Sequence, residues 1–180
     1  GPRALVEILS TLDGSLPLCV LIVQHMPDKF TAAFAERLDR VSSFEVREAK
    51  NGDVLAPGLA LVAPGAAVMT VERLANAQVR VRVAEPGPED RFVPSIDKVF
   101  VSAAHALGQD VLAVVLTGMG SDGSEGLRRV HEKGGRAIAE SERTAVIFGM
   151  PEEAIRTGVV DETLPLDLIA AAITKHAKPG

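Results

Sequence analysis

Two apolar runs, each followed by a chemically reactive polar side chain, place the strongest constraint on the fold of this chain. Val111–Leu116 leads into a glycine-rich turn that holds Asp122, and Leu18–Val23 ends two residues before His25. Uninterrupted runs of branched apolar residues are typical of strands that a parallel sheet buries on both faces. In open α/β sheets, sites form just beyond the carboxyl ends of such strands. We therefore expect the side chains of His25 and Asp122 to be hydrogen-bonded to each other.

Helical and strand-like patterns alternate along the chain, which indicates an α/β fold. Apolar stripes at helical spacing predict helices over Arg3–Leu12, Asp28–Val41, Ile96–Leu107, Gly123–Lys133, Pro151–Gly158 and Leu166–Ile173. Apolar or alternating runs predict strands over Leu18–Val23, Leu59–Ala63, Val68–Glu72, Gln78–Val83, Val111–Leu116 and Arg136–Ala139, with a further short apolar run at Ala145–Phe148. We predict one domain over residues 1–180, a three-layer, doubly wound sandwich. Its sheet is expected to be mostly parallel, with an antiparallel hairpin at one edge.

Composition narrows the classes of partner. Of the 180 residues, 47% are hydrophobic and 24% are charged, which is typical of a globular protein. A net charge of −5, scattered basic residues and the absence of Trp and Tyr argue against a nucleic-acid partner. No apolar run approaches the roughly 20 residues that span a bilayer, so no membrane insertion is expected. The single Cys19 lies in an apolar run and favours a reducing compartment, which we take to be the cytoplasm.

His25 and Asp122 each admit more than one interpretation. A histidine after a buried strand can take a proton from a hydroxyl near neutral pH, or it can simply complete a strand-to-helix turn. Asp122 can orient such an imidazole, cap the next helix or belong to a phosphate-binding turn. The turn sequence GMGSDG is neither a P-loop nor GxGxxG, so the nucleotide interpretation is the weakest. Backbone N–H groups near Met119, between Gly118 and Gly120, would suit a developing oxyanion.

The remaining polar residues indicate neither a metal nor a cofactor. Helical patterns contain the other three histidines, which are His105, His131 and His176. No spacing of Cys, His and carboxylate residues resembles a zinc site. We therefore expect no metal and no cofactor. Glu140 and Glu142 follow a predicted strand, where they either flank the site or are simply solvated.

Four motifs occur in register over essentially the whole chain: QHMP at Gln24–Pro27, PSID at Pro94–Asp97, LTGMGSDGSEGL at Leu116–Leu127 and VIFGMP at Val146–Pro151. Together they resemble the catalytic domain of the chemotaxis protein-glutamate methylesterase (CheB) family. The resemblance implies an α/β domain that hydrolyses glutamate γ-methyl esters on the cytoplasmic helices of chemoreceptors and often deamidates particular glutamines. It also implies a Ser–His–Asp triad, in which His25 matches the general base and Asp122 matches its orienting partner.

The chain departs from the pattern of that family at several positions. The nucleophile of the family lies in a segment resembling GASTGGP, of which only Gly1-Pro2 corresponds here. The serine is therefore expected three residues before Gly1, and its strand also lies upstream of the printed sequence. Val68 stands where the family usually has His, and Glu140 where it usually has Gln, which affects substrate contacts more than fold. The receiver domain that often precedes the catalytic domain is not in the sequence.

No serine within the sequence is a convincing replacement for the nucleophile. Ser10 lies in a predicted helix, Ser15 in a loop and Ser95 at a helix cap, while Ser121 is adjacent to Asp122 in a tight turn. A serine hydroxyl needs a neighbouring base to become a nucleophile. We expect the intact protein to carry the upstream serine; the alternative is a domain that lacks its nucleophile.

The resemblance implies methylated chemoreceptor helices as the substrate. It also implies a receiver domain or a kinase of the same pathway as a further partner. Two other functions stay open. One is a non-catalytic signalling or scaffold domain of the same fold, and the other is an esterase for small molecules. A serine within hydrogen-bonding distance of His25 separates the enzymes from the scaffold, and turnover of free esters alone identifies the small-molecule esterase.

Overall fold

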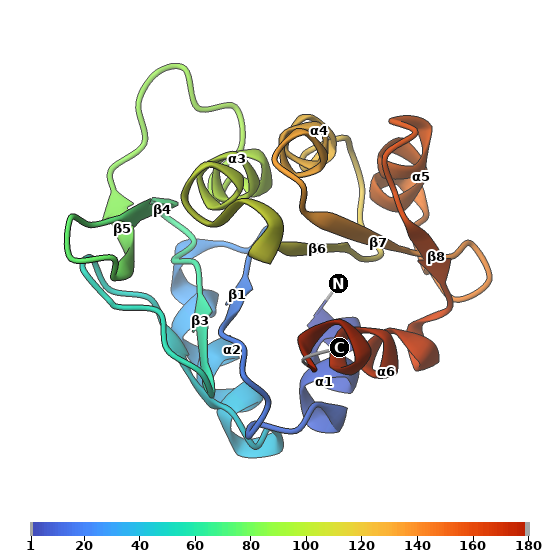
Figure 1. Ribbon diagram of the computed structural model, residues 1–180, viewed down its shortest axis with the longest axis horizontal. Coiled ribbons are helices and arrows are strands. Elements are labelled where there is room, and N and C mark those ends of the chain that lie inside the picture. The colour runs from blue at the N-terminus through green and yellow to red at the C-terminus, as the bar shows by residue number, and fades with distance from the viewer. Residues whose placement is uncertain (1, 179–180) are drawn as a thin grey trace.

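The computed structural model describes residues 2–178 (Figure 1). The helices are α1 (Pro2–Thr11), α2 (Asp28–Val41), α3 (Ile96–Leu107), α4 (Ser124–Glu132), α5 (Gly149–Arg156) and α6 (Leu166–Ala177), with a short 3-10 helix at Gly108–Asp110. The strands are β1 (Val20–Ile22), β2 (Glu45–Glu48), β3 (Leu59–Val62), β4 (Val68–Arg73), β5 (Val79–Ala84), β6 (Leu112–Val115), β7 (Arg136–Glu140) and β8 (Glu162–Leu164).

The strands form two parallel sheets and one antiparallel pair. In the first parallel sheet β3 lies between β1 and β2, and in the second β7 lies between β6 and β8. The antiparallel pair β4–β5 is a separate two-stranded sheet, in which Val71 faces Val81. The predicted α/β class, with mostly parallel strands and one antiparallel hairpin, is confirmed.

Helices cover both faces of the parallel sheets, which gives the three layers. In Figure 1, α3, α4 and α5 lie on one side of β6, β7 and β8, and α1 and α6 lie on the other. Helix α2 packs on β2 and β3. The main apolar cluster takes Ile22 and Val62 from one parallel sheet and Ile138 from the other, so a single core joins them. Burying a side chain of this size stabilises the fold by about 1.5–3 kcal/mol.

Helices α3 and α4 approach each other closely because α4 carries glycine at the contact. A Cβ placed on Gly126 would lie 2.5 Å from Cβ of Phe100 in α3. Gly123, which immediately precedes α4, has a φ of 108°, and a Cβ there would lie 3.1 Å from Cγ2 of Ile96. A larger residue at either position would therefore push the two helix starts apart.

Three local features of the structure do not follow from the sequence patterns. Strands β2 and β8 are not predicted, because both are short edge strands of polar sequence whose periodicity is weak. The short apolar run Ala145–Phe148 forms neither a strand nor part of the core: the backbone of Ile147 is hydrogen-bonded to the side chain of Thr117, and Val146 is 89% exposed. Pro151 lies within α5 rather than at its first position, since that helix begins at Gly149.

Candidate active site

The side chains of His25 and Asp122 meet between the two parallel sheets. His25 follows β1, and Asp122 lies in the turn between β6 and α4. The Nε2 atom of His25 lies 2.7 Å from Oδ2 of Asp122, which confirms the predicted hydrogen bond. The imidazole is 32% exposed and the carboxylate only 1%. Because Nε2 is used by the aspartate, Nδ1 is the ring nitrogen that remains for exchanging a proton with a substrate or nucleophile.

Asp122 is held from two sides by hydrogen bonds to its carboxylate. Oδ2 accepts from the backbone N–H of Ile96 at 2.8 Å as well as facing His25, and Oδ1 accepts from the N–H of Asp97 at 2.9 Å. Burial by itself would raise the pKa of Asp122, but the hydrogen bonds from His25, Ile96 and Asp97 outweigh it and hold that pKa below its usual value. The carboxylate therefore stays charged, which orients the imidazole and stabilises its protonated form.

The ring of Phe92 covers one face of His25. The two ring centroids are 5.7 Å apart and the planes are inclined by 17°, which is a stacked arrangement. Phe92 belongs to the loop between β5 and α3. Asp90 stabilises this loop because its carboxylate accepts from the N–H of Gly87 and forms an ion pair with Lys98. The loop thus limits the rotation of the imidazole. No sequence pattern predicts this contact.

The predicted oxyanion turn presents only some of its N–H groups. Gly118 donates its N–H to the carbonyl oxygen of Ile147 at 2.9 Å, so that group is already engaged. In the part of the chain that the structure describes, the N–H groups of Met119 and Gly120 donate no hydrogen bond. Met119 is 75% exposed. The turn can therefore offer adjacent donors at Met119 and Gly120, whereas Gly118 anchors it.

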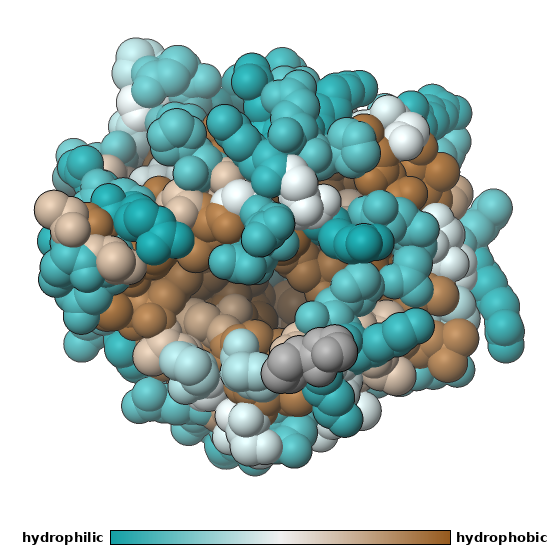
Figure 2. Space-filling view, viewed as in Figure 1, coloured by the Kyte–Doolittle hydropathy of each residue, from teal (hydrophilic) through white to brown (hydrophobic). Residues whose placement is uncertain are grey.

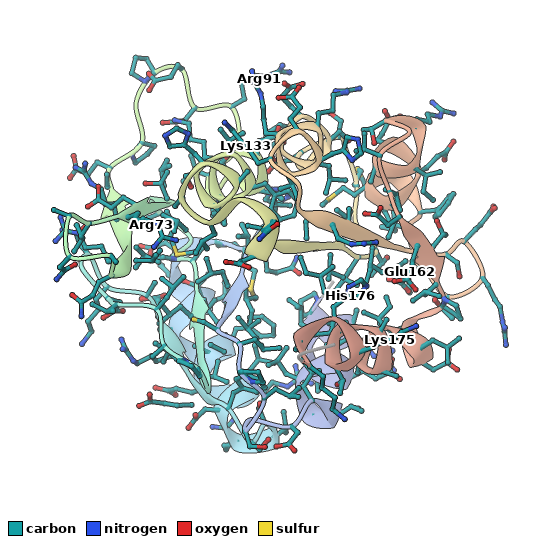
Figure 3. All side chains as sticks on the ribbon, viewed as in Figure 1. Arg73, Arg91, Lys133, Glu162, Lys175 and His176 are labelled. Carbon is teal, nitrogen blue, oxygen red and sulfur yellow. The ribbon has the colours of Figure 1, made fainter. Side chains whose placement is uncertain are left out.

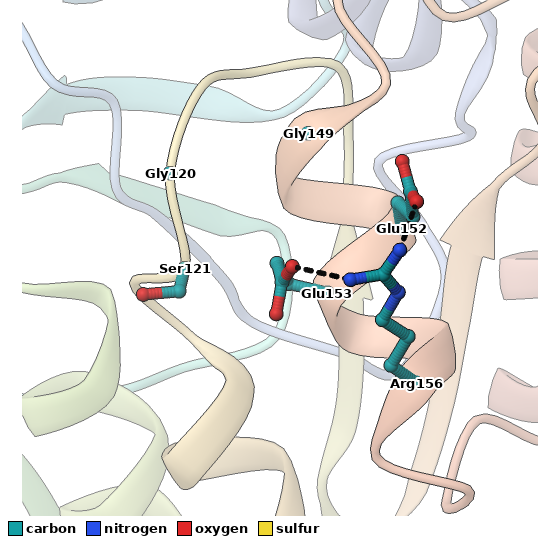
Figure 4. Close-up of a pocket in the computed structure, with 6 residues that line it drawn as sticks. All are labelled: Gly120, Ser121, Gly149, Glu152, Glu153 and Arg156. Carbon is teal, nitrogen blue, oxygen red and sulfur yellow. Dashed lines mark hydrogen bonds and ion pairs between the residues drawn. The ribbon is translucent and has the colours of Figure 1, made fainter.

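A shallow groove borders the same turn (Figure 4). It is lined by Gly120, Ser121, Gly149, Glu152, Glu153 and Arg156. Arg156 is paired with Glu152 at 2.7 Å and with Glu153 at 3.3 Å, so one cation on the α5 side faces two carboxylates and this wall keeps a net negative charge. Ser121 lies on the opposite side of the groove from this ion-paired cluster.

Glu140, the last residue of β7, is completely buried. Its Oε1 accepts from the N–H of Thr117 at 2.9 Å, and its Oε2 accepts from the hydroxyl of Thr144 at 2.9 Å. The hydroxyl of Thr144 in turn accepts from the N–H of Leu166 at the start of α6. The buried carboxylate of Glu140 therefore connects the turn at Thr117 with the start of α6 through hydrogen bonds. Glu142, in contrast, is exposed.

The other candidate residues lie away from the His25–Asp122 pair. His105, His131 and His176 lie on helices, as predicted, and all three are exposed; His176 faces Glu162 at 2.9 Å (Figure 3). Ser95 caps α3 by accepting from the N–H of Lys98, as predicted.

Within residues 2–178, no serine hydroxyl is hydrogen-bonded to His25, and no group of three or more His, Cys, Asp or Glu residues could hold a metal ion. Among the described helices, none has the length and apolar character to cross a membrane.

This fold and site define an α/β protein with a histidine–aspartate pair of the kind that nucleophilic hydrolases use. Residues 1–173 match the family model described as CheB methylesterase. The chain therefore belongs to the CheB methylesterase family, which confirms the resemblance in the sequence. The crystal structure of the Thermotoga maritima CheB methylesterase catalytic domain is similar, with a TM-score of 0.93 and 35% sequence identity over 97% of this chain and 92% of that one.

Curated relatives with similar sequences carry the names of enzymes. "Protein-glutamate methylesterase/protein-glutamine glutaminase 3" of Geobacter sulfurreducens is 49% identical over 98% of this chain and 47% of its own length. "Protein-glutamate methylesterase/protein-glutamine glutaminase 6" of Anaeromyxobacter dehalogenans is also 49% identical, over 99% of this chain and 52% of its own. The chain thus spans about half the length of the curated relatives it matches.

Proposed function

We propose that this chain is the catalytic part of a protein-glutamate methylesterase that also deamidates glutamine. The observation that carries the proposal is the 2.7 Å hydrogen bond between His25 and the buried Asp122. The names of the relatives support the same reaction, since several of them are called protein-glutamate methylesterase/protein-glutamine glutaminase. Ester and amide hydrolysis share an acyl-transfer mechanism, so one site serves both.

In the proposed mechanism, a serine hydroxyl attacks the γ-carbonyl carbon of the methyl ester while Nδ1 of His25 takes the hydroxyl proton. Asp122 accepts the Nε2–H hydrogen bond and stabilises the imidazolium. The tetrahedral intermediate collapses, the C–O bond to the methoxy group breaks, and His25 returns the proton so that methanol leaves. Water then attacks the acyl-serine with the same help from His25, which releases glutamate and regenerates the serine. For a glutamine side chain, ammonia replaces methanol as the leaving group.

The turn after β6 supplies the stabilisation of the oxyanion in this proposal. The N–H groups of Met119 and Gly120 donate to no acceptor among the described residues, and they lie in the same turn as Asp122. Donors that are already oriented toward a developing negative charge lower the barrier without reorganising. Gly118 holds the turn in place through its bond to Ile147.

We propose that the serine lies three residues before Gly1, on a strand between β1 and β6. Among the described residues, β1 pairs only with β3 and β6 pairs only with β7. The other edge of each of these two strands therefore has no partner strand within the described residues. Figure 2 shows an apolar hollow near the middle of this face, over β1, β6 and α6 as they lie in Figure 1. A parallel strand followed by α1 and then β1 would make an ordinary βαβ crossover. Its carboxyl end would bring the serine to the edge that carries His25.

We propose methylated chemoreceptor helices as the substrate, and a receiver domain or a kinase of the same pathway as the regulating partner. The site is compatible with a protein substrate because the imidazole and the Met119 turn are exposed at the surface rather than enclosed. Chemoreceptor methylation sites lie on cytoplasmic helices, so the proposed location of the enzyme is the cytoplasm. The two alternatives, a scaffold domain and a small-molecule esterase, lack a comparable observation in their favour.

The decisive experiment is methanol release from a methylated chemoreceptor by the full-length protein and its His25→Ala variant. Removing a triad member is expected to lower kcat at least about 10³-fold. His105→Ala is the matched control, because that histidine is exposed on α3 and remote from the carboxylate, and it should leave the rate unchanged. Equal rates for the wild type and His25→Ala would exclude His25 as the base. Turnover of free methyl esters without turnover of receptor would instead identify a small-molecule esterase.

A further inference from the structure

The N-termini of α3 and α4 exchange carboxylates. Asp122, which precedes α4, accepts from the N–H groups of Ile96 and Asp97 in the first turn of α3. Asp97, in turn, accepts through Oδ1 from the N–H of Gly123 at 2.9 Å and from the N–H of Gly126 at 2.8 Å, at the start of α4. Each carboxylate therefore binds the backbone donors that the opposite helix leaves free.

From this exchange we propose that Asp97 is a positioning residue, which holds Asp122 in the orientation that pairs with His25. The peptide N–H of Gly123 belongs to the bond that immediately follows Asp122. When Asp97 binds that N–H, it fixes the backbone on one side of Asp122, while the Asp97 N–H fixes the carboxylate itself. The role in catalysis rests on the function proposed above, whereas the geometry does not.

Asp97 is not required as the cap of its own helix. Ser95 already caps α3, since its hydroxyl accepts from the N–H of Lys98 at 3.1 Å. Helix α4, in contrast, begins after Gly123 and has no side-chain cap from its own N-cap residue. Asp97, which belongs to α3, supplies the acceptor that the start of α4 lacks. Its carboxylate accepts from the N–H of Gly123, the residue that follows Asp122.

The exchange requires the close approach of α3 and α4. Gly126 donates to Asp97 and also permits the contact with Phe100, because a Cβ on Gly126 would lie 2.5 Å from Cβ of Phe100. A larger side chain at this position would separate the helix starts and lengthen both hydrogen bonds to Asp97. Packing and positioning of the catalytic carboxylate are therefore coupled at one glycine.

Keeping a second carboxylate beside Asp122 has an electrostatic cost. Burial raises the pKa of Asp97, and the charge of Asp122 raises it further, while the N–H groups of Gly126 and Gly123 act in the opposite direction. A like charge near the functional carboxylate would be unfavourable without these donors. The pKa of Asp97 stays above its usual value, so the two N–H groups offset only part of the cost of burial and of the neighbouring charge.

The test compares three variants of the full-length protein, which are Asp97→Ala, Asp97→Asn and Asp167→Asn. Asparagine keeps an oxygen that can accept from Gly123 and Gly126, and no hydrogen bond to the second oxygen of Asp97 is found within residues 2–178. Asp167 is the matched control, because it is an exposed carboxylate in the first turn of α6. Two readouts are used: kcat and KM for methanol release from methylated receptor, and the far-downfield NMR signal of the proton between His25 and Asp122.

Asp97→Ala should lower kcat about 100-fold with little change in KM, because a displacement of about 1 Å at a catalytic group has that effect. The downfield proton signal should be lost or broadened in Asp97→Ala and retained in Asp97→Asn, whose kcat should stay within about tenfold of the wild type. Asp167→Asn should match the wild type in both readouts. Gly126→Ala should reproduce the loss of kcat and of the signal with Asp97 intact.

Two results would overturn the proposal. One is an unchanged kcat and an unchanged proton signal in folded Asp97→Ala, which would leave Asp97 as a helix cap only. The other is a loss in Asp97→Asn as large as that in Asp97→Ala, which would mean that hydrogen-bond acceptance is not its role. Because the proton signal does not depend on turnover, it tests the positioning even if the protein proves not to be a methylesterase. Thermal melting identifies any variant that is unfolded. If Asp97→Ala is unfolded, the kcat and the proton signal of the nearly isosteric Asp97→Asn are compared with those of the wild type instead.

Discussion

Asp122 and Glu140 are two buried carboxylates at the ends of neighbouring strands, yet they have different partners. Asp122 follows β6 and is 3% exposed, while Glu140 ends β7, the strand paired with β6, and is fully buried. Both accept a backbone N–H, from Ile96 and Thr117 respectively. Only Asp122 also faces a titratable ring, His25, whereas Glu140 is bonded to a threonine hydroxyl.

The difference shows that burial and hydrogen bonding do not by themselves mark a catalytic carboxylate. A carboxylate that is bonded only to neutral groups stabilises a local structure, here the turn at Thr117 and the start of α6. A carboxylate with the same burial that faces an imidazole can also change the proton affinity and orientation of that ring. The partner, rather than the burial, separates the two roles.

The largest expected effect is that of Asp122→Asn on the rate. An amide at this position cannot stabilise the imidazolium and favours the wrong tautomer of His25, which costs about 10⁴-fold in kcat in a comparable triad. The measurement is methanol release by the full-length protein, with the exposed Asp110→Asn as the control. A kcat within tenfold of the wild type would show that the pair is structural, and the contrast with Glu140 would disappear.

At Glu140 the expected effect is on stability rather than on chemistry. Glu140→Leu removes the oxygens that accept from the Thr117 N–H and from the Thr144 hydroxyl, which are both partly buried contacts. A fully buried donor that loses its acceptor costs about 1–3 kcal/mol in the free energy of unfolding, so we expect a loss toward the lower end of that range at each contact. Glu140→Gln keeps one accepting oxygen and should retain both stability and activity. Urea unfolding and kcat are compared with those of Glu142→Gln, an exposed neighbour.

A loss of activity in Glu140→Gln as large as that in Asp122→Asn would break the comparison, since the two carboxylates would then both serve the chemistry. An unchanged free energy of unfolding in Glu140→Leu would contradict the role of Glu140 in connecting the turn with α6.

The smallest expected effect is the pH dependence of the stability contributed by Asp122. Burial opposes its charge, but the hydrogen bonds from His25, Ile96 and Asp97 prevail and lower the pKa of Asp122 in the folded state. A lowered folded-state pKa gives stability that is fully present above the ordinary carboxyl value of about 3.9 and is lost as the pH falls through the folded value. The difference in unfolding free energy between the wild type and Asp122→Asn should therefore narrow below about pH 4. A difference that is constant from pH 7 to pH 3 would argue against a lowered pKa.

Much of the fold and the central pair of the site follow from local sequence patterns. Val111–Leu116 and Leu18–Val23 predict buried parallel strands because continuous branched apolar residues suit a sheet that is covered on both faces. Strands β2 and β8 are not predicted, because an edge strand is solvated on one side and its polar residues leave no clear period.

The chain by itself determined the α/β architecture, the family and the placement of His25 and Asp122 beyond strand ends, because periodicity and motif spacing are properties of neighbouring residues. Only the tertiary structure decided which ring nitrogen Asp122 engages, that Phe92 stacks on His25 and that the N–H of Gly118 is already hydrogen-bonded. It also decided that Asp97 and Asp122 each accept from N–H groups at the start of the other's helix. Those contacts join residues that are distant in sequence. Their distances depend on how closely α3 and α4 pack at Gly126, which no local pattern records.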